Sequence, residues 1–200
     1  MKQFLTVKNF SLLFLVACCL GSCTVVGTLY PVYDNEKNFV MKDELIGKWK
    51  DPNDKKGSIV VEKSDDIKEY KIAVVNVSDE GKEETNYFTG HLVNDKGTYF
   101  LEYWYNLNDD LRDFVVVRHF LSKITFAGKD KIELSFIDAD KLVKNIDQKK
   151  LQLGYMKQKT GTDSYSYLVV DKTPILQKAM TDLKKYPEIF TDKATLVRSE

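Results

Sequence analysis

The sequence predicts a mainly β fold, in which an antiparallel meander of about eight or nine strands closes into a barrel and a C-terminal α-helix follows. Three observations lead to this prediction. The chain of 200 residues holds 11 Tyr and 11 Phe, and many of them lie in runs with Val and Ile, as in strands. Short polar turns separate the runs, and short connections favour antiparallel neighbours. One strong helical pattern comes late, near residues 174–185.

The first 22 residues indicate an export signal. Lys2 and Lys8 make the first residues of the chain basic, and an apolar run at 10–21 follows. Because this run is too short to cross a bilayer as a helix, the pattern favours a secretory signal over a transmembrane anchor.

All three cysteines lie in this region, and the last of them closes the stretch Leu20-Gly21-Ser22-Cys23. This stretch resembles the lipobox of bacterial lipoproteins. The resemblance implies that Cys23 becomes the first residue of the mature chain and carries a diacylglycerol thioether. Leu15-Val16-Ala17-Cys18 matches the same pattern, so Cys18 is the alternative site. We favour Cys23, because processing at Cys18 would leave a very short apolar core.

A lipid on Cys23 implies a protein tethered to a membrane and not embedded in it. Thr24, rather than Asp, follows the cysteine, and by resemblance to Gram-negative sorting rules this implies transfer to the outer membrane, on either its periplasmic or its surface side. Residues 23–43 lack clear periodicity and hold Gly27 and Pro31. They therefore predict a tether that leads to a domain over 44–200.

Nine runs in this domain are typical of strands, and polar turns such as those at 51–57, 78–84, 93–97 and 127–130 separate them. The runs lie at 45–50, 57–63, 69–77, 86–93, 98–106, 114–126, 131–137, 150–157 and 165–170. In 131–137, Ile132, Leu134 and Phe136 alternate with polar residues, which predicts one buried face. The preceding run should place Phe120, Ile124 and Phe126 on that same face and His119 on the other.

The run at 98–106 is apolar on both faces. Tyr99, Leu101, Tyr103 and Tyr105 alternate with Phe100, Glu102 and Trp104, which suits a barrel or a sheet covered on both sides. Aromatic rings can form the wall of a ligand site. The candidate ligand-binding residues are Phe100, Tyr103, Trp104 and Tyr105, and the alternative is that these side chains form core and cross-strand aromatic pairs.

Two segments carry helical patterns. Residues 138–150 place Leu142, Val143 and Ile146 on one stripe. The stronger pattern begins at Thr173-Pro174, with Thr as the expected N-cap and Pro at the first helical position, and Pro187 ends it. The final stretch at 194–198 predicts an edge strand or a packed tail.

The meander, the late helix and Gly47-Lys48-Trp49 on the first strand together resemble the lipocalin-like group of calycin barrels. The resemblance implies that Gly47 allows tight packing while Trp49 plugs the closed end of the barrel. It also implies an arginine that packs over the tryptophan. Arg198 is the candidate for that role, and a solvated terminal charge is the alternative interpretation of this residue.

The charge balance and the lack of catalytic sequence motifs favour a protein without catalytic chemistry. Lys plus Arg and Asp plus Glu are both 30, so no excess of positive charge indicates nucleic acid as a partner. His91 and His119 have no cysteine or second histidine at metal-ligand spacing. No Gly-x-Ser-x-Gly elbow or phosphate-binding loop is present. We therefore expect no catalytic residues, no metal and no cofactor.

These observations predict a lipid-anchored cell-envelope protein that is not an enzyme. The leading hypothesis is that its barrel binds a small apolar or amphipathic ligand. The alternative is a module that holds another envelope protein with the exterior or the rim of the barrel. A hydrolase that uses scattered carboxylates is the third hypothesis, and it would require two acidic groups with opposed pKa shifts in one pocket.

Overall fold

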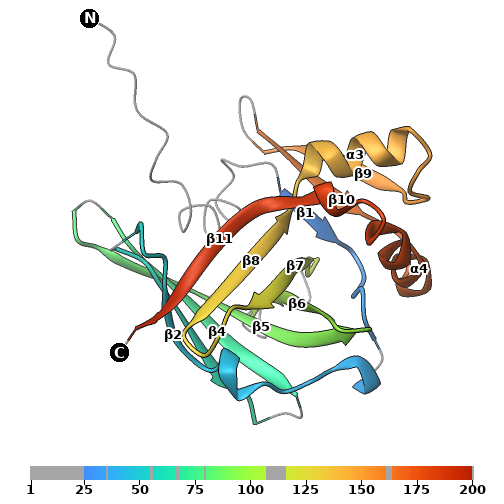
Figure 1. Ribbon diagram of the computed structural model, residues 1–200. Coiled ribbons are helices and arrows are strands. Elements are labelled where there is room, and N and C mark those ends of the chain that lie inside the picture. Colours follow the sequence, from blue (N-terminus) through green and yellow to red (C-terminus); the bar gives the residue numbers. More distant parts are fainter. Residues whose placement is uncertain are drawn as a thin grey trace, which may run out of the picture.

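The computed structural model describes residues 25–34, 36–54, 56–65, 68–78, 80–106, 116–160 and 164–199 (Figure 1). The predicted export signal and Cys23, the predicted site of lipid attachment, lie outside the described residues. Among the helices that are described, none is both long and apolar enough to cross a membrane.

The main body is a closed antiparallel barrel of eight strands, which confirms the predicted mainly β barrel. Seven strands follow one another as a meander, and the last strand of the chain fills the gap between the first and the seventh. The barrel strands are β2 (Gly47–Lys50), β3 (Ser58–Lys63), β4 (Glu69–Val77), β5 (Glu83–Asp95), β6 (Thr98–Tyr105), β7 (His119–Phe126), β8 (Lys131–Ile137) and β11 (Phe190–Ser199).

β11 is a full barrel strand, whereas the sequence predicts only an edge strand or a tail there. It pairs with β8 through seven register positions and with β2 through three, including Arg198 opposite Trp49. Ala194 and Leu196 point into the interior. Pairing on both sides leaves no open edge, because the two ends of the meander are joined through β11.

Two of the nine predicted strands lie outside the barrel. They form β9 (Tyr155–Lys159) and β10 (Tyr165–Val169), which pair with each other, while β10 also pairs in parallel with β1 (Val25–Thr28). This small sheet meets the barrel where Thr28 pairs with His119 of β7. In Figure 1 it lies beside the barrel together with the helices.

Much of the segment that the sequence predicts as a tether is packed on the domain. After β1, short 3-10 turns follow at η1 (Glu36–Asn38) and η2 (Asp43–Leu45). Val32, Tyr33 and Phe39 are buried. Their irregular spacing has no period of a helix or a strand, so the sequence carries no signal that they would be buried.

Both predicted helices are present, as α3 (Ala139–Asp147) and α4 (Thr173–Leu183). The carboxylate of Asp138 caps α3 by accepting a bond from the Lys141 amide at 3.0 Å. Thr173 does not cap α4, which begins after Lys172. Its hydroxyl instead donates to the carbonyl oxygen of Pro31 at 2.6 Å, and so it joins the helix to the N-terminal segment. A 3-10 turn, η3 (Pro187–Ile189), leads into β11.

The buried apolar residues form two clusters, one on each face of the barrel wall. The inner cluster fills the barrel and includes Trp49, Tyr70, Leu101 and Ile124. The outer cluster lies between the wall and the layer made of β1, β9, β10 and the helices, and it includes Phe100 and Leu121. This explains why β6 is apolar on both faces: each face packs on a core.

Candidate functional site

One end of the barrel is sealed by Trp49 and Arg198. The Trp49 side chain is fully buried, and its ring nitrogen donates to the carbonyl oxygen of Leu45 at 2.8 Å. Arg198 lies over the indole with its guanidinium carbon 4.5 Å from the ring centroid. The guanidinium also donates to the carbonyl oxygens of Ile46 at 2.6 Å and Glu44 at 2.8 Å. Arg198 is therefore part of the barrel base and not a solvated terminal charge.

The packing around Arg198 depends on Gly47. Gly47 has φ +138°, a conformation that L side chains rarely adopt, and a Cβ atom there would overlap the Nη1 atom of Arg198. Because glycine has no Cβ, the guanidinium can reach the backbone of η2 and close the base.

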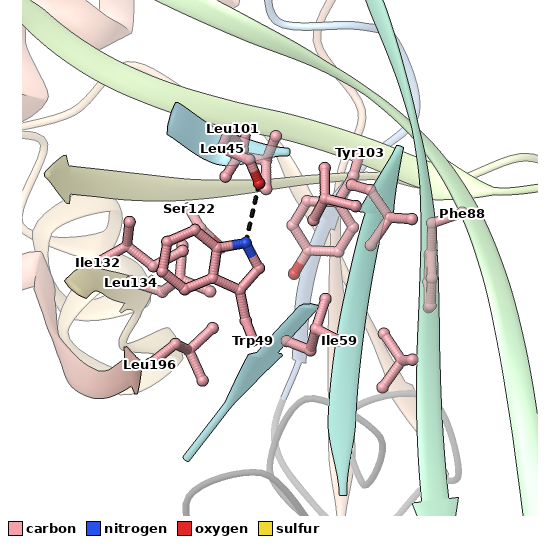
Figure 2. Close-up of a pocket in the computed structure, with 13 residues that line it drawn as sticks. Leu45, Trp49, Ile59, Phe88, Leu101, Tyr103, Ser122, Ile132, Leu134 and Leu196 are labelled. Carbon is pink, nitrogen blue, oxygen red and sulfur yellow. Dashed lines mark hydrogen bonds between the residues drawn. The ribbon is translucent and has the colours of Figure 1, made fainter. Parts of the chain in front are cut away.

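The barrel interior is almost completely filled by side chains. Figure 2 shows the residues that line the space that remains. The remaining cavity measures about 30 Å³, roughly the volume of one water molecule in the liquid. Its lining is apolar except for a few groups, among them Ser122, whose hydroxyl is buried without a hydrogen-bond partner. The lining residues are Leu45, Trp49, Ile59, Val61, Ile72, Val74, Phe88, Leu101, Tyr103, Ser122, Ile132, Leu134 and Leu196.

The four predicted ligand-binding residues do not line one site. Tyr103 and Tyr105 point into the barrel and pack on Phe88, with ring centroids 5.8 and 4.4 Å from it. Phe100 belongs to the outer cluster, and Trp104, which shares its strand face, contacts the two histidines. The separation follows from the alternation of side chains along β6. These contacts are the core and cross-strand pairs of the alternative interpretation.

A larger groove lies at the sealed end of the barrel, on its rim. It measures about 390 Å³ and we call it the Lys42 groove; it is lined by Lys42, Gly97, Thr98, Tyr99, Lys123, Ile124, Thr125 and Phe126. The Lys42 ammonium lies 5.0 Å from the Tyr99 ring centroid and 5.1 Å from that of Phe126. The two rings are perpendicular, with centroids 5.6 Å apart.

The backbone holds Lys42 in place at this groove. Its amide donates to the Tyr70 phenol oxygen at 2.7 Å, and Tyr70 itself is buried in the barrel. Among the described residues, the Lys42 ammonium has one weak ion pair, with the half-exposed carboxylate of Glu44 at 3.8 Å. Lys123 has no ion pair within the described part of the chain. The groove therefore offers two cationic groups beside two aromatic faces, a combination that suits an anion with an apolar portion.

A second polar cluster lies on the outer face of the barrel, beneath the N-terminal segment. The carboxylate of Glu102 is only 1% exposed and accepts bonds from the amides of Val32 at 2.6 Å and Tyr33 at 3.1 Å. His119 Nδ1 lies 3.7 Å from Glu102 Oε1. Burial raises the pKa of Glu102 to about 7, and burial lowers the pKa of His119 to about 4.

His91 completes this cluster. Its Nε2 lies 3.0 Å from the Glu69 carboxylate, and burial lowers the pKa of His91. The Trp104 ring contacts both His91 and His119, with centroids 5.1 and 5.3 Å away. Within the described residues, no three His, Cys, Asp or Glu side chains are arranged to hold a metal ion. The role that these contacts support is structural, because Glu102 fixes the N-terminal segment to the barrel wall.

Comparisons of the chain with protein-family models, with curated proteins and with solved structures found no match.

Sequence reasoning missed both the Lys42 groove and the Glu102 cluster. Lys42 lies in the segment predicted as a tether, and Lys123 is one of several polar residues on its strand, so neither residue is distinguished by the sequence pattern. Glu102 carried a signal that could have been used. A single acid within a strand that is apolar on both faces must be buried on one of them, and buried acids need partners.

Proposed function

We propose that this protein is a lipid-anchored, non-enzymatic binding protein of the bacterial cell envelope, which binds a small amphipathic molecule with an anionic group in the Lys42 groove. The observation that carries the proposal is a difference in volume. Sites for small molecules usually measure about 300–1,000 Å³. The groove, at about 390 Å³, falls within this range, whereas the interior cavity of about 30 Å³ does not.

The chemistry of the groove supports an anionic ligand. Lys42 and Lys123 can each donate charge-assisted hydrogen bonds to a carboxylate, phosphate or sulfate. Tyr99 and Phe126 offer apolar surface for the remainder of the molecule. The lining lacks an acid, so nothing within the groove itself opposes a negative charge.

The envelope location rests on the lipobox at Leu20-Gly21-Ser22-Cys23. A diacylglycerol on Cys23 would anchor the chain in a membrane, and the resemblance to sorting rules favours the outer membrane. We assign no catalytic role to any residue.

A ligand inside the barrel is the second candidate, and one observation favours it. The hydroxyl of Ser122 is buried, faces the cavity and has no partner, and such a group gains from a polar ligand atom. An interior ligand of ordinary size would have to displace packed side chains, which is why the groove is the better candidate.

The test uses the mature protein, purified from membranes and placed in lipid nanodiscs, with hexyl phosphate and hexanol as matched soluble probes. We expect saturable binding of hexyl phosphate, followed by NMR or calorimetry, and weaker binding of hexanol. Lys123→Gln should weaken hexyl phosphate binding by about tenfold, the usual effect of losing one charge-assisted bond. Lys178→Gln on the exposed face of α4 makes the same charge change away from the groove and should have no effect.

Four outcomes would overturn the proposal. Equal binding of the two probes would show that the ligand needs no anionic group. Equal effects of Lys123→Gln and Lys178→Gln would show that the groove is not the binding site. Loss of binding in Ser122→Thr, which adds one methyl group to the interior cavity, would favour the interior site. A stoichiometric protein partner in native mass spectrometry, with no bound small molecule, would favour a protein-interaction module at the rim or exterior.

A further inference from the structure

The folded part of the chain begins very close to the proposed lipid. Val25 is the first residue of β1 and pairs with Ser166 at the start of β10. Cys23 precedes Val25 by two residues, so their Cα atoms are at most about 7 Å apart, the reach of two extended residues. This distance is much shorter than a flexible tether would provide. A lipid on Cys23 would therefore hold this end of the small sheet near the membrane surface.

We propose that the membrane-facing surface of the protein is the end of the β1–β10–β9 sheet formed by Val25, Arg118, Lys157, Lys159 and Tyr165, which we call the anchor face, and that it binds anionic lipid headgroups. This inference rests on the lipid anchor of the proposed function and adds the orientation of the domain and the class of lipid.

The cations of the anchor face lie on both sides of the sheet end. Lys157 and Lys159 are exposed on β9, and Lys159 pairs with Tyr165 of β10. Arg118 reaches across the same end, because its guanidinium donates to Gln158 at 2.6 Å and to Ser166 at 3.3 Å. Within the described part of the chain, none of these three cations forms an ion pair, and each can bind the phosphate of a lipid headgroup.

Apolar and aromatic groups accompany the cations. Met156 on β9 and Val116, two residues before Arg118, are each 61% exposed. The Lys157 ammonium lies 3.9 Å from the Tyr165 ring centroid, which places an aromatic ring next to the charge. Tyrosine and lysine side chains are well suited to the boundary between headgroups and water. The anchor face therefore combines charge complementarity with side chains that tolerate the interface.

This orientation leaves the Lys42 groove open to solvent. The groove lies at the sealed end of the barrel, where β11 ends at the C-terminus. In Figure 1 that end and the β9–β10 hairpin lie on opposite sides of the molecule. An anchor face turned toward the membrane would therefore direct the groove away from it.

The test measures which part of the lipidated protein lies near the membrane. Thr160→Cys, next to Lys159, and Lys129→Cys, in the turn between β7 and β8, each introduce one thiol for a fluorophore on exposed residues. The labelled proteins are reconstituted in vesicles that contain headgroup-spin-labelled lipid, with phosphatidylcholine alone or mixed with phosphatidylglycerol. We expect strong quenching at position 160, little at position 129, and a larger difference with phosphatidylglycerol.

The contribution of the two lysine charges to membrane binding is tested with the double variant Lys157→Gln/Lys159→Gln in the Thr160→Cys background. The double variant should weaken the contact with phosphatidylglycerol membranes by about fivefold per lysine. Lys129→Gln/Lys193→Gln removes the same charge from exposed positions outside the anchor face and should change nothing. Equal effects of the two double variants would overturn the headgroup interaction.

The failure of this inference can be told apart from failure of the proposed anchor. Mass spectrometry of the mature protein reports the diacylglycerol thioether directly. If the lipid is present and the probes at positions 160 and 129 are quenched equally, the proposed membrane-facing surface is wrong, whereas the proposed lipid anchor is supported. If the lipid is absent, both the anchor and the orientation derived from it are wrong.

Discussion

At the scale of single residues, Glu102 and His119 show how burial can set opposite protonation states on neighbouring groups. Burial disfavours a charge on either side chain, so it raises the pKa of the acid to about 7 and lowers the pKa of the base to about 4. Near pH 5 to 6 the folded protein therefore favours a neutral pair. Of these two side chains, only Glu102 also accepts hydrogen bonds from backbone amides, which are those of Val32 and Tyr33.

The two groups should make opposite contributions to the pH dependence of stability. Glu102 keeps a proton in the folded state that the unfolded chain loses above its ordinary pKa of 4.5, so its contribution to the free energy of unfolding falls from about pH 4.5 to 7. His119 stays neutral while the unfolded chain gains a proton below 6.5, so its contribution rises from about pH 4 to 6.5. Each contribution is at most about 3 kcal/mol, from the cost of about 1.36 kcal/mol for each unit by which the pKa differs.

Urea unfolding of two variants between pH 4.5 and 7 tests this prediction. Relative to the parent chain, Glu102→Gln should make stability rise more steeply with pH, because the contributions of His119 and His91 remain. His119→Gln should shift the slope in the opposite direction. Parallel pH profiles for the two variants would contradict the assignment.

At the scale of elements, the base of the barrel depends on one contact between β2 and β11. Gly47→Ala should lower the free energy of unfolding by about 2–4 kcal/mol, because it combines a strained φ with displacement of Arg198. Gly81→Ala is the matched control, since Gly81 also has positive φ but no atom lies within 4 Å of its Cβ position. It should lower stability by about 1 kcal/mol. Equal losses, measured by urea unfolding, would mean that Arg198 has no part in the effect.

The elements themselves were largely predictable, and their assignment to layers was not. Alternation of Ile132, Leu134 and Phe136 correctly predicted the inner face of β8, and the interior does contain these residues with Ile124. The same kind of pattern produced β9 and β10, which are strands but lie outside the barrel. Alternation of apolar and polar residues with a period of two indicates that a strand has two different faces. It does not indicate which other strand pairs with it.

At the scale of the whole molecule, closure of the barrel depends on its last strand, β11. A chain that ends at residue 186 lacks β11 and with it both ladders that join β2 to β8. We expect this truncated chain to lose the cooperative thermal unfolding transition, because two strand edges and the inner cluster become exposed. Removal of residue 200 alone should leave the transition intact. Circular dichroism during heating checks both chains, and cooperative unfolding of the shorter chain would contradict the role of β11.

The candidate site shows the same dependence on the whole molecule. Lys42, Tyr99 and Lys123 come from separate parts of the chain and meet at one rim of the barrel. Single-strand patterns carry no information on such a meeting, because it depends on register across β5, β6 and β7. The predicted aromatic wall failed to form one site for the complementary reason, since β6 sends Tyr103 and Phe100 to opposite faces.

The sequence by itself determined the mainly β class, most of the strands, both helices and the resemblance that motivates a lipid on Cys23. These features depend on local spacing and on short motifs, which a linear chain displays directly. The tertiary structure decided which strands form the barrel, that Val32, Tyr33 and Phe39 pack on it, that its interior is filled, and that a groove lies on its rim. Those features depend on pairings between distant segments, such as β2 with β11, and local periodicity does not encode them.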